Sequence, residues 1–280
     1  MKKTHLIPMR FAHTGVPNAA PENTLEAYAA AVEAGYEGIE MDINMTKDGE
    51  IFCFHGPCFK GVTAGKDLRM IGDLTTEEVR KIDIPYRNGL LPKEPPKEWT
   101  EHLAGLPFVN EPDDPENRVT HLITFEEFDR WLGEQDVDIT VEVEFKTTGM
   151  LPRMTEILKN SKNVKRYIFF SGEMETLEEM QEWYRTHEKP EGLRFGANIR
   201  WLNDETMAFI RKSDLYEVGL NNERFTKEDV DFLATMGIKV FSNLGDYPEW
   251  WARLAPYGVT GFKTNYAATY TCWLEQQERK

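Results

Sequence analysis

The sequence predicts an α/β protein, a TIM-type (β/α)8 barrel built as a single domain. The chain has 280 residues, close to the roughly 250 that such a barrel takes. Short apolar runs, several of them rich in β-branched and aromatic residues, alternate with amphipathic stretches, and no segment is repeated. This alternation is typical of a parallel sheet covered by helices, and the number of runs favours a closed barrel over an open sheet.

The expected strands are apolar runs, several of which are bounded by Gly, Asn or Asp. They cover residues 5–12, 38–43, 139–145, 166–170, 193–198, 216–220, 238–242 and 260–264. A further run at 50–55 follows the Lys47-Asp48-Gly49 turn, which predicts a local hairpin with the second strand.

The expected helices fall between most of these strands. The first, at 24–34, places Leu25, Tyr28 and Val32 on one face and follows an Asn23/Thr24 cap. The others cover residues 124–131, 151–158, 173–186, 204–211, 227–236 and 247–255.

One segment, residues 57–118, does not follow this alternation of strand and helix patterns. It contains one short helical pattern, at 75–82, and then seven prolines from Pro85 to Pro115. Connections this long inside a domain are usually functional or mobile. Because the segment leaves the carboxyl end of the second strand, where barrel enzymes build their sites, we expect a loop excursion that partly covers the site.

The composition disfavours several kinds of partner. Lys and Arg number 33 against 48 Asp and Glu, a formal net charge of −15, which disfavours nucleic acid and anionic membrane surfaces. The three cysteines do not form a disulfide framework in a chain of this length. No apolar run approaches the roughly 20 residues of a membrane span, and the start of the chain lacks a secretory signal pattern. We expect a soluble cytoplasmic protein without stable membrane insertion; its oligomeric state is not encoded in any pattern found.

Carboxylates alternate along two of the expected strands. Glu40 and Asp42 are two residues apart, which places them on one strand face with Cα atoms about 6.5–7 Å apart. Glu142, Glu144 and Lys146 repeat the pattern on the next barrel strand. Carboxylates gathered at a barrel mouth suit a hard divalent cation, and Lys146 could hold an anion beside it. The alternative for either strand is a solvated polar face.

Two histidines end strands beside these carboxylates. His13 closes the first strand, and His55 closes the run after the Lys47-Asp48-Gly49 turn. A single histidine at a strand end is more often structural. Two imidazoles in one mouth, one protonated and one neutral near pH 7, suit general acid and base catalysis.

Several short motifs follow one another in a fixed order near the beginning of the chain. They are Ala12-His13-Thr14-Gly15, Pro21-Glu22-Asn23-Thr24, Ile39-Glu40-Met41-Asp42, Thr46-Lys47-Asp48-Gly49 and His55. In order and spacing they resemble the N-terminal signature of the glycerophosphodiester phosphodiesterase family. Glu144-Phe145-Lys146 and the run at 258–265 are similar to later family segments, although Asn265 stands where the family usually has Asp.

The resemblance implies hydrolysis of a glycerophosphodiester, an activity of lipid metabolism, to an alcohol and glycerol phosphate. It implies one bound divalent cation, Mg²⁺ or Ca²⁺, held by Glu40, Asp42 and Glu144. It also implies that His13 and His55 are the acid–base pair. Lys146 then corresponds to a phosphate-holding cation.

The chain departs from the family pattern where the family grips and orients phosphate. Thr14 and Gly56 replace an Arg and an Asp that usually follow the two histidines, and Lys60-Gly61 lies where a further Arg is common. Phe241 and Leu244 replace a Trp and an Asn. A hydroxyl does not form the bidentate, charged hydrogen bonds that a guanidinium forms with phosphate.

These departures leave two explanations open. Lys60, Arg10 or Arg200 supplies the missing charge, with Thr14 and Lys60 near the substrate, or the substrate is not an ordinary glycerophosphodiester. Two other functions also stay open: a barrel that binds a metal and a phosphoester without turnover, and a lyase that stops at a cyclic phosphate.

Overall fold

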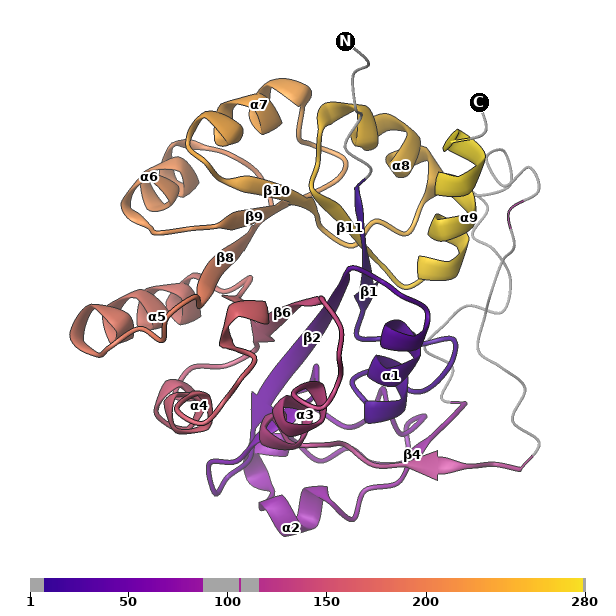
Figure 1. The fold of residues 1–280 in the computed structure, drawn as a ribbon. Coiled ribbons are helices and arrows are strands. Elements are labelled where there is room, and N and C mark those ends of the chain that lie inside the picture. The colour runs from indigo at the N-terminus through magenta and orange to yellow at the C-terminus, as the bar shows by residue number, and fades with distance from the viewer. Residues whose placement is uncertain (1–7, 88–105, 107–115, 279–280) are drawn as a thin grey trace.

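The computed structural model describes residues 8–87, 106 and 116–278. Within these residues, eight parallel strands close into a barrel, because β1 (Met9–His13) pairs with both β2 (Gly38–Met45) and β11 (Gly261–Thr264). The strands from β2 round to β11 are β6 (Thr140–Phe145), β7 (Tyr167–Phe170), β8 (Arg194–Ile199), β9 (Glu217–Leu220) and β10 (Lys239–Ser242). The predicted (β/α)8 barrel is confirmed, and Figure 1 shows the helices around the outside of the strands.

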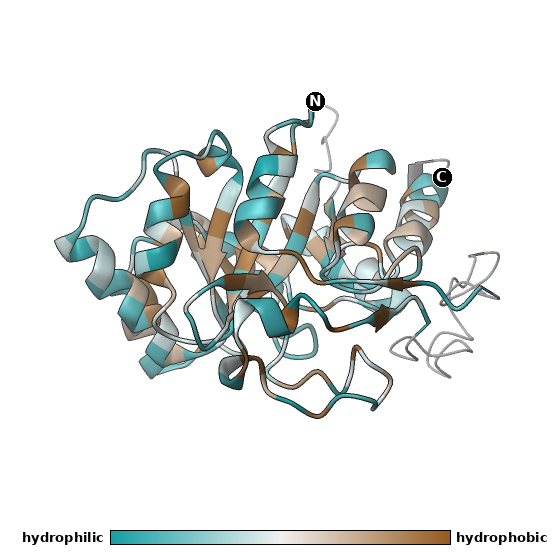
Figure 2. Ribbon diagram, turned by 90° about the horizontal axis from the view of Figure 1, so that it is seen from below, coloured by the Kyte–Doolittle hydropathy of each residue, from teal (hydrophilic) through white to brown (hydrophobic). Residues whose placement is uncertain are grey.

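The helices lie where the amphipathic patterns predicted them. They are α1 (Leu25–Glu33), α3 (Phe125–Leu132), α4 (Leu151–Leu158), α5 (Met174–Thr186), α6 (Asp204–Lys212), α7 (Lys227–Thr235) and α8 (Pro248–Leu254). Several begin with a side-chain cap; Thr124 and Glu127, for example, form a capping box at the start of α3. Figure 2 shows apolar strands inside a layer of helices that carry both hydrophilic and apolar residues.

The last helix, α9 (Ala267–Glu278), was not predicted. Its apolar residues do not follow a clear helical period, so the sequence gives no amphipathic signal there. The helix is held by tertiary packing instead: the buried ring of Tyr270 lies 4.9 Å from Trp251 of α8 and 5.4 Å from Phe262 of β11, measured between centroids.

The first part of the 57–118 segment is more ordered than a loop. After β3 (Ile51–Cys53), which pairs antiparallel with β2, it contains a 3₁₀ turn (Ile71–Asp73), α2 (Thr76–Val79) and β4 (Ile84–Pro85), and β4 pairs with β5 (Val119–Thr120). α2 ends three residues earlier than the predicted helix. Most of the proline-rich part lies outside the described residues.

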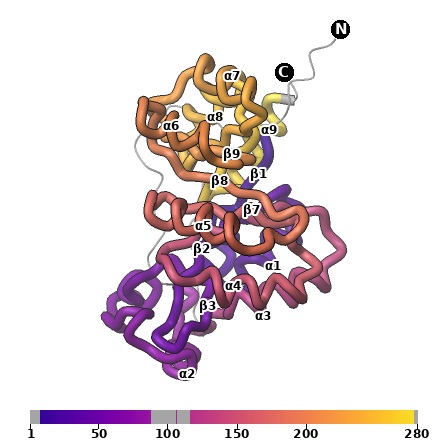
Figure 3. The backbone as a smooth tube through the Cα atoms, turned by 90° about the vertical axis from the view of Figure 1, so that its left-hand side faces the viewer, coloured from indigo at the N-terminus to yellow at the C-terminus, as the bar shows by residue number. Residues whose placement is uncertain are grey.

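The described residues between 52 and 122, called the insertion below, have an apolar core of their own beside the barrel. The buried residues of that core are Phe52, Phe54, Phe59, Val62, Ile71, Leu74, Val79, Ile82, Ile84 and Leu122. Figure 3 shows the lobe next to β3 at one edge of the barrel. That the 57–118 segment partly covers the site stays a prediction.

Parallel register brings the predicted site residues to one end of the barrel. His13 is aligned with Glu40 across β1 and β2, and Asp42 with Glu144 across β2 and β6. Since His13 is the last residue of β1 and Glu144 the penultimate residue of β6, the group lies at the carboxyl ends of the strands. This is the end at which barrel enzymes place their sites.

Candidate active site

Three carboxylates converge inside the barrel mouth. One oxygen each from Glu40, Asp42 and Glu144 lies within 4.8 Å of the other two. Glu40 and Asp42 are almost completely buried, at 2% and 0% exposure. Buried carboxylates need a compensating charge, and a group of oxygen donors at this spacing fits a hard divalent cation.

Lys146 lies against this cluster. Its Nζ is 3.0 Å from Oδ1 of Asp42 and 2.8 Å from Oε2 of Glu144. Oδ1 of Asp42 is buried and accepts no hydrogen bond, so the ion pair is its polar contact among the described residues. Burial opposes ionisation of Asp42, but Lys146, followed by His55 and His13, holds the pKa of Asp42 below its usual value.

The loop between β1 and α1 orients Asp42 from the other side. Nδ2 of Asn23 donates to Oδ2 of Asp42 at 2.9 Å, and the backbone N–H of Asp42 donates to Oδ1 of Asn23 at 3.0 Å. The hydroxyl of Tyr28 donates to the same Oδ1 at 2.8 Å. Asn23 has a φ of 56°, a left-handed conformation that Asn tolerates better than most residues.

Glu22 precedes Asn23 and lies close to the same charges. Burial, followed by the neighbouring Asp42, raises the pKa of Glu22. From the sequence, Asn23 was expected only to cap a helix together with Thr24, and neither Glu22 nor Asn23 was assigned a role in the site. The only signal was their position in the Pro21-Glu22-Asn23-Thr24 motif.

His13 faces the carboxylates with one ring nitrogen. Its Nε2 is 3.8 Å from Oε2 of Glu40, and its Nδ1 is 2.8 Å from Oδ1 of Asn265. Burial, followed by the Asp42 carboxylate, raises the pKa of Glu40 to about 8. Charge on Glu40 is partly balanced by the backbone N–H of Thr14, which donates to Oε2 at 3.2 Å.

His55 is exposed. With Lys146 it lines a cavity of about 820 Å³ between the barrel mouth and the insertion. Lys47, Asp73 and Glu173 also line this cavity. His13 is therefore in direct contact with the carboxylate cluster, whereas His55 lines the cavity that Lys146 also lines.

The cations proposed to replace the missing arginine lie in different places. Arg10 is turned away from the mouth: it forms a bidentate pair with Glu37 at 2.9 and 2.5 Å and donates to the carbonyl of Gly35. The alternative that Arg10 holds phosphate is therefore wrong, because alternate residues of β1 face opposite sides of the sheet. Lys60 is exposed on the insertion and does not line the cavity, and Arg200 is exposed just after β8.

Thr14 offers the site its backbone rather than its side chain. The residue is 1% exposed, and its hydroxyl donates to the carbonyl of His13 at 2.7 Å. Its φ of 56° is unusual for a β-branched residue. This conformation turns the N–H of Thr14 toward Glu40.

A second group of charges lies deeper in the barrel and was not predicted. Nζ of Lys263 is 2.8 Å from Oε2 of Glu142, and both side chains are at most 3% exposed. Burial, followed by Glu142, raises the pKa of Glu217 well above its usual value. The neutral form of Glu217 is therefore favoured beside this ion pair.

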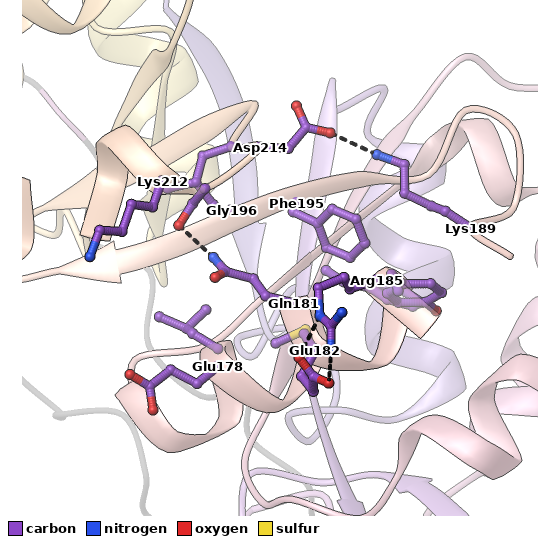
Figure 4. A pocket seen from close by; sticks show the side chains of 15 residues that line it. Glu178, Gln181, Glu182, Arg185, Lys189, Phe195, Gly196, Lys212 and Asp214 are labelled. Carbon is purple, nitrogen blue, oxygen red and sulfur yellow. Dashed lines mark hydrogen bonds and ion pairs between the residues drawn. The ribbon is translucent and has the colours of Figure 1, made fainter. Parts of the chain in front are cut away.

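A separate hollow of about 610 Å³ lies between α5 and α6 on the outside of the barrel (Figure 4). Its charged side chains largely pair with one another: Arg185 donates to Glu182 at 2.8 Å, and Lys189 to Asp214 at 3.0 Å. None of the clustered carboxylates lines it. The barrel mouth is therefore the candidate active site.

The sequence is similar to those of known proteins. Residues 13–269 match the model of the glycerophosphoryl diester phosphodiesterase family. A segment of 78 residues is 37% identical to a glycerophosphodiester phosphodiesterase of Caldanaerobacter subterraneus subsp. tengcongensis, covering 28% of this chain and 31% of that protein. One of 87 residues is 40% identical to glycerophosphodiester phosphodiesterase 1 of Rattus norvegicus, covering 31% and 25%. The aligned segments thus span less than a third of these relatives.

The fold is similar over nearly the whole chain. A putative glycerophosphoryl diester phosphodiesterase of Silicibacter pomeroyi superposes with a TM-score of 0.77 at 18% identity, covering 97% of this chain and 95% of that one. A phosphodiesterase of Oleispira antarctica, solved in complex with the product sn-glycerol-3-phosphate, gives 0.73 at 17% identity, with 96% and 97% covered. Since the family model spans most of the sequence, the chain belongs to the glycerophosphoryl diester phosphodiesterase family.

Proposed function

We propose that this protein hydrolyses a glycerophosphodiester, or a related phosphodiester, to an alcohol and glycerol phosphate, with one bound divalent cation and an acid–base pair of histidines. The observation that carries the proposal is the convergence of Glu40, Asp42 and Glu144 with His13 at one end of the barrel, with His55 lining the cavity that Lys146 also lines. Family membership supports it, as does the similar fold of the phosphodiesterase that was solved with sn-glycerol-3-phosphate.

Glu40, Asp42 and Glu144 would hold the cation, Mg²⁺ or Ca²⁺. The buried Oδ1 of Asp42, which accepts no hydrogen bond and is ion-paired to Lys146, would be one of the ligand atoms. When bound, the ion would neutralise negative charge on the phosphate. Lys146, at the edge of the same cluster, would hold a phosphate oxygen. Thr14 and Lys60 remain expected substrate neighbours.

The two histidines would move the protons. With its Nδ1 on Asn265, His13 presents Nε2 to the mouth and would take the proton of the glycerol 2-hydroxyl as that oxygen attacks phosphorus. His55, beside the open cavity, would give a proton to the alcohol oxygen as its bond to phosphorus breaks. Water would then open the cyclic phosphate to glycerol phosphate.

Product analysis tests this function. The protein is incubated with glycerophosphocholine, with and without EDTA, and released glycerol phosphate is measured by coupled oxidation while phosphorus NMR follows the intermediates. We expect glycerol phosphate to form without EDTA and its formation to stop when EDTA is added. Cyclic phosphate as the final product would instead identify a lyase. Binding of the diester without any product would identify a non-catalytic phosphoester-binding barrel.

The expected partners are small molecules. A net charge of −15 disfavours nucleic acid, and no helix in the described part of the chain is long and apolar enough to cross a bilayer. Cytoplasmic location remains a prediction from the sequence.

A further inference from the structure

A chain of hydrogen bonds leads from His13 to an acidic residue outside the metal cluster. Nδ1 of His13 lies 2.8 Å from Oδ1 of Asn265, the residue that follows β11. Nδ2 of Asn265 donates to Oδ2 of Asp246 at 2.9 Å. Asp246 lies in the loop between β10 and α8, so three separate segments meet behind the imidazole.

The donors around Asp246 decide which way the amide of Asn265 points. Oδ1 of Asp246 accepts from the backbone N–H of Asn265 and from the hydroxyl of Thr264, both at 2.9 Å. Its Oδ2 therefore faces the side chain of Asn265. An ionised carboxylate only accepts hydrogen bonds, so it selects the amide nitrogen of Asn265 and leaves the amide oxygen toward His13.

The orientation of the amide in turn decides the tautomer of His13. An amide oxygen accepts but does not donate, so Nδ1 of His13 has to carry the proton in the neutral ring. Nε2 is then the unprotonated nitrogen, and it is the nitrogen that faces Glu40. A general base needs its lone pair on this side of the ring.

We propose that Asp246 is a positioning residue, which acts through Asn265 to hold His13 as the tautomer with its proton on Nδ1. The functional part of this inference rests on the proposed role of His13 as a base. The tautomer itself does not depend on that role and can be observed separately.

Asp246→Asn should exchange donors and acceptors along these hydrogen bonds. The remaining side-chain oxygen would stay with the fixed backbone N–H of Asn265, which leaves an NH₂ group facing the amide of Asn265. That amide would turn over to offer its oxygen, and its own NH₂ would face His13. A donor next to Nδ1 favours the neutral ring with its proton on Nε2.

Adding Asn265→Asp to Asp246→Asn should restore the original tautomer. A carboxylate at position 265 would accept both from the NH₂ group behind it and from Nδ1 of His13. The pair of substitutions exchanges the charged and the amide side chain without changing the net charge. Asp214→Asn, at an exposed residue of the outer hollow, is the control for loss of one negative charge.

The experiment combines a spectrum with kinetics. Protein labelled with ¹⁵N-histidine is recorded at pH 8.5 by long-range ¹H–¹⁵N correlation, with His13 assigned from the spectrum of His13→Gln. We expect the Nδ1-protonated tautomer in wild type, in Asp214→Asn and in the double variant, and the Nε2-protonated tautomer in Asp246→Asn. kcat on the diester should fall about 10²-fold in Asp246→Asn, within the range for a lost general base, with KM little changed, and recover at least tenfold in the double variant.

Two results would overturn the inference. One is an unchanged tautomer in an Asp246→Asn variant that melts like wild type. The other is an Asp246→Asn protein whose tautomer changes but is not restored by Asn265→Asp. If the tautomers respond as expected while His13→Gln retains full activity, the positioning role stands and the catalytic role of His13 is wrong.

Discussion

Nζ of Lys146 lies 3.0 Å from Oδ1 of Asp42, inside a group of carboxylates that would otherwise repel one another. Burial opposes the charge on Lys146, yet Asp42, followed by Glu144, raises its pKa above the usual value. One ammonium does not balance Glu40, Asp42 and Glu144 when all three are ionised, as they would be as ligands of a cation. The imbalance is what makes a divalent cation the expected occupant.

Asp42→Asn should abolish metal-dependent stabilisation. The carboxylate lies at the centre of the cluster, and its replacement removes a charged ligand without changing its size. In wild type, a cation at 100 times its Kd should add about 2.7 kcal/mol to the free energy of unfolding. Calorimetric melts with and without Mg²⁺ or Ca²⁺ measure this, with Asp214→Asn as the matched change outside the site. Failure of wild type to bind either ion would refute the metal site.

His13→Ala and His55→Ala should each keep the fold and lower turnover by about 10²–10⁴-fold, the usual effect of losing an acid–base group. The pH–rate profile of wild type should be bell-shaped, because one histidine has to be neutral and the other protonated. Each variant should lose one limb of the bell. His121→Ala serves as the control, because His121 is exposed and lies outside the cavity. A variant with wild-type rates would return that histidine to a structural role.

Thr14→Arg distinguishes a site that has only lost part of its phosphate binding from a pocket rebuilt for another phosphodiester. The side chain of Thr14 is buried, so a guanidinium there would have to displace its neighbours or enter the mouth. We expect lower activity on the true substrate. If the site has only lost its phosphate grip, the new cation should improve binding by roughly 1.5–3 kcal/mol, one to two decades in KM.

The comparison for Thr14→Arg is Thr14→Ser, which keeps the hydroxyl and removes the methyl group. Steady-state kinetics on a panel of glycerophosphodiesters measures both variants. Enhanced hydrolysis of every diester by Thr14→Arg would contradict a rebuilt pocket and indicate an ordinary but weakened enzyme.

Glu37→Gln should lower stability in a pH-dependent way. Burial works against the charge of Glu37, but the hydrogen bonds from Arg10 lower its pKa below the usual value. An acid with a lowered pKa in the folded state stabilises the protein above its unfolded pKa and loses this effect as the pH falls. Because Glu37 is 42% exposed, we expect a loss of only about 1 kcal/mol at pH 7.

Urea unfolding of wild type and Glu37→Gln at several pH values measures this difference. It should shrink as the pH falls below about 4.3, the ordinary pKa of Glu. Glu182→Gln is the matched control, since its pair with Arg185 lies on the exposed surface of α5. A difference that stays constant from pH 7 to pH 3.5 would mean that the charge of Glu37 contributes nothing.

The sequence by itself determined the features that depend on local pattern. Each barrel strand is a short apolar run, and the alternation of Glu40 with Asp42 and of Glu142 with Glu144 puts each pair on one strand face whatever the rest of the chain does. The helices with one apolar face were predictable for the same reason. α9 was not, because its sequence has no such face and its helix depends on packing against Trp251 and Phe262.

Only the tertiary structure decided which groups surround each catalytic candidate. His13 and Asn265 are 252 residues apart in sequence and meet because β1 closes the barrel against β11. The closed barrel likewise brings Lys263 of β11 to Glu142 of β6. Such contacts follow from strand order and register, which are fixed by packing of the whole barrel. No local period of the sequence encodes them.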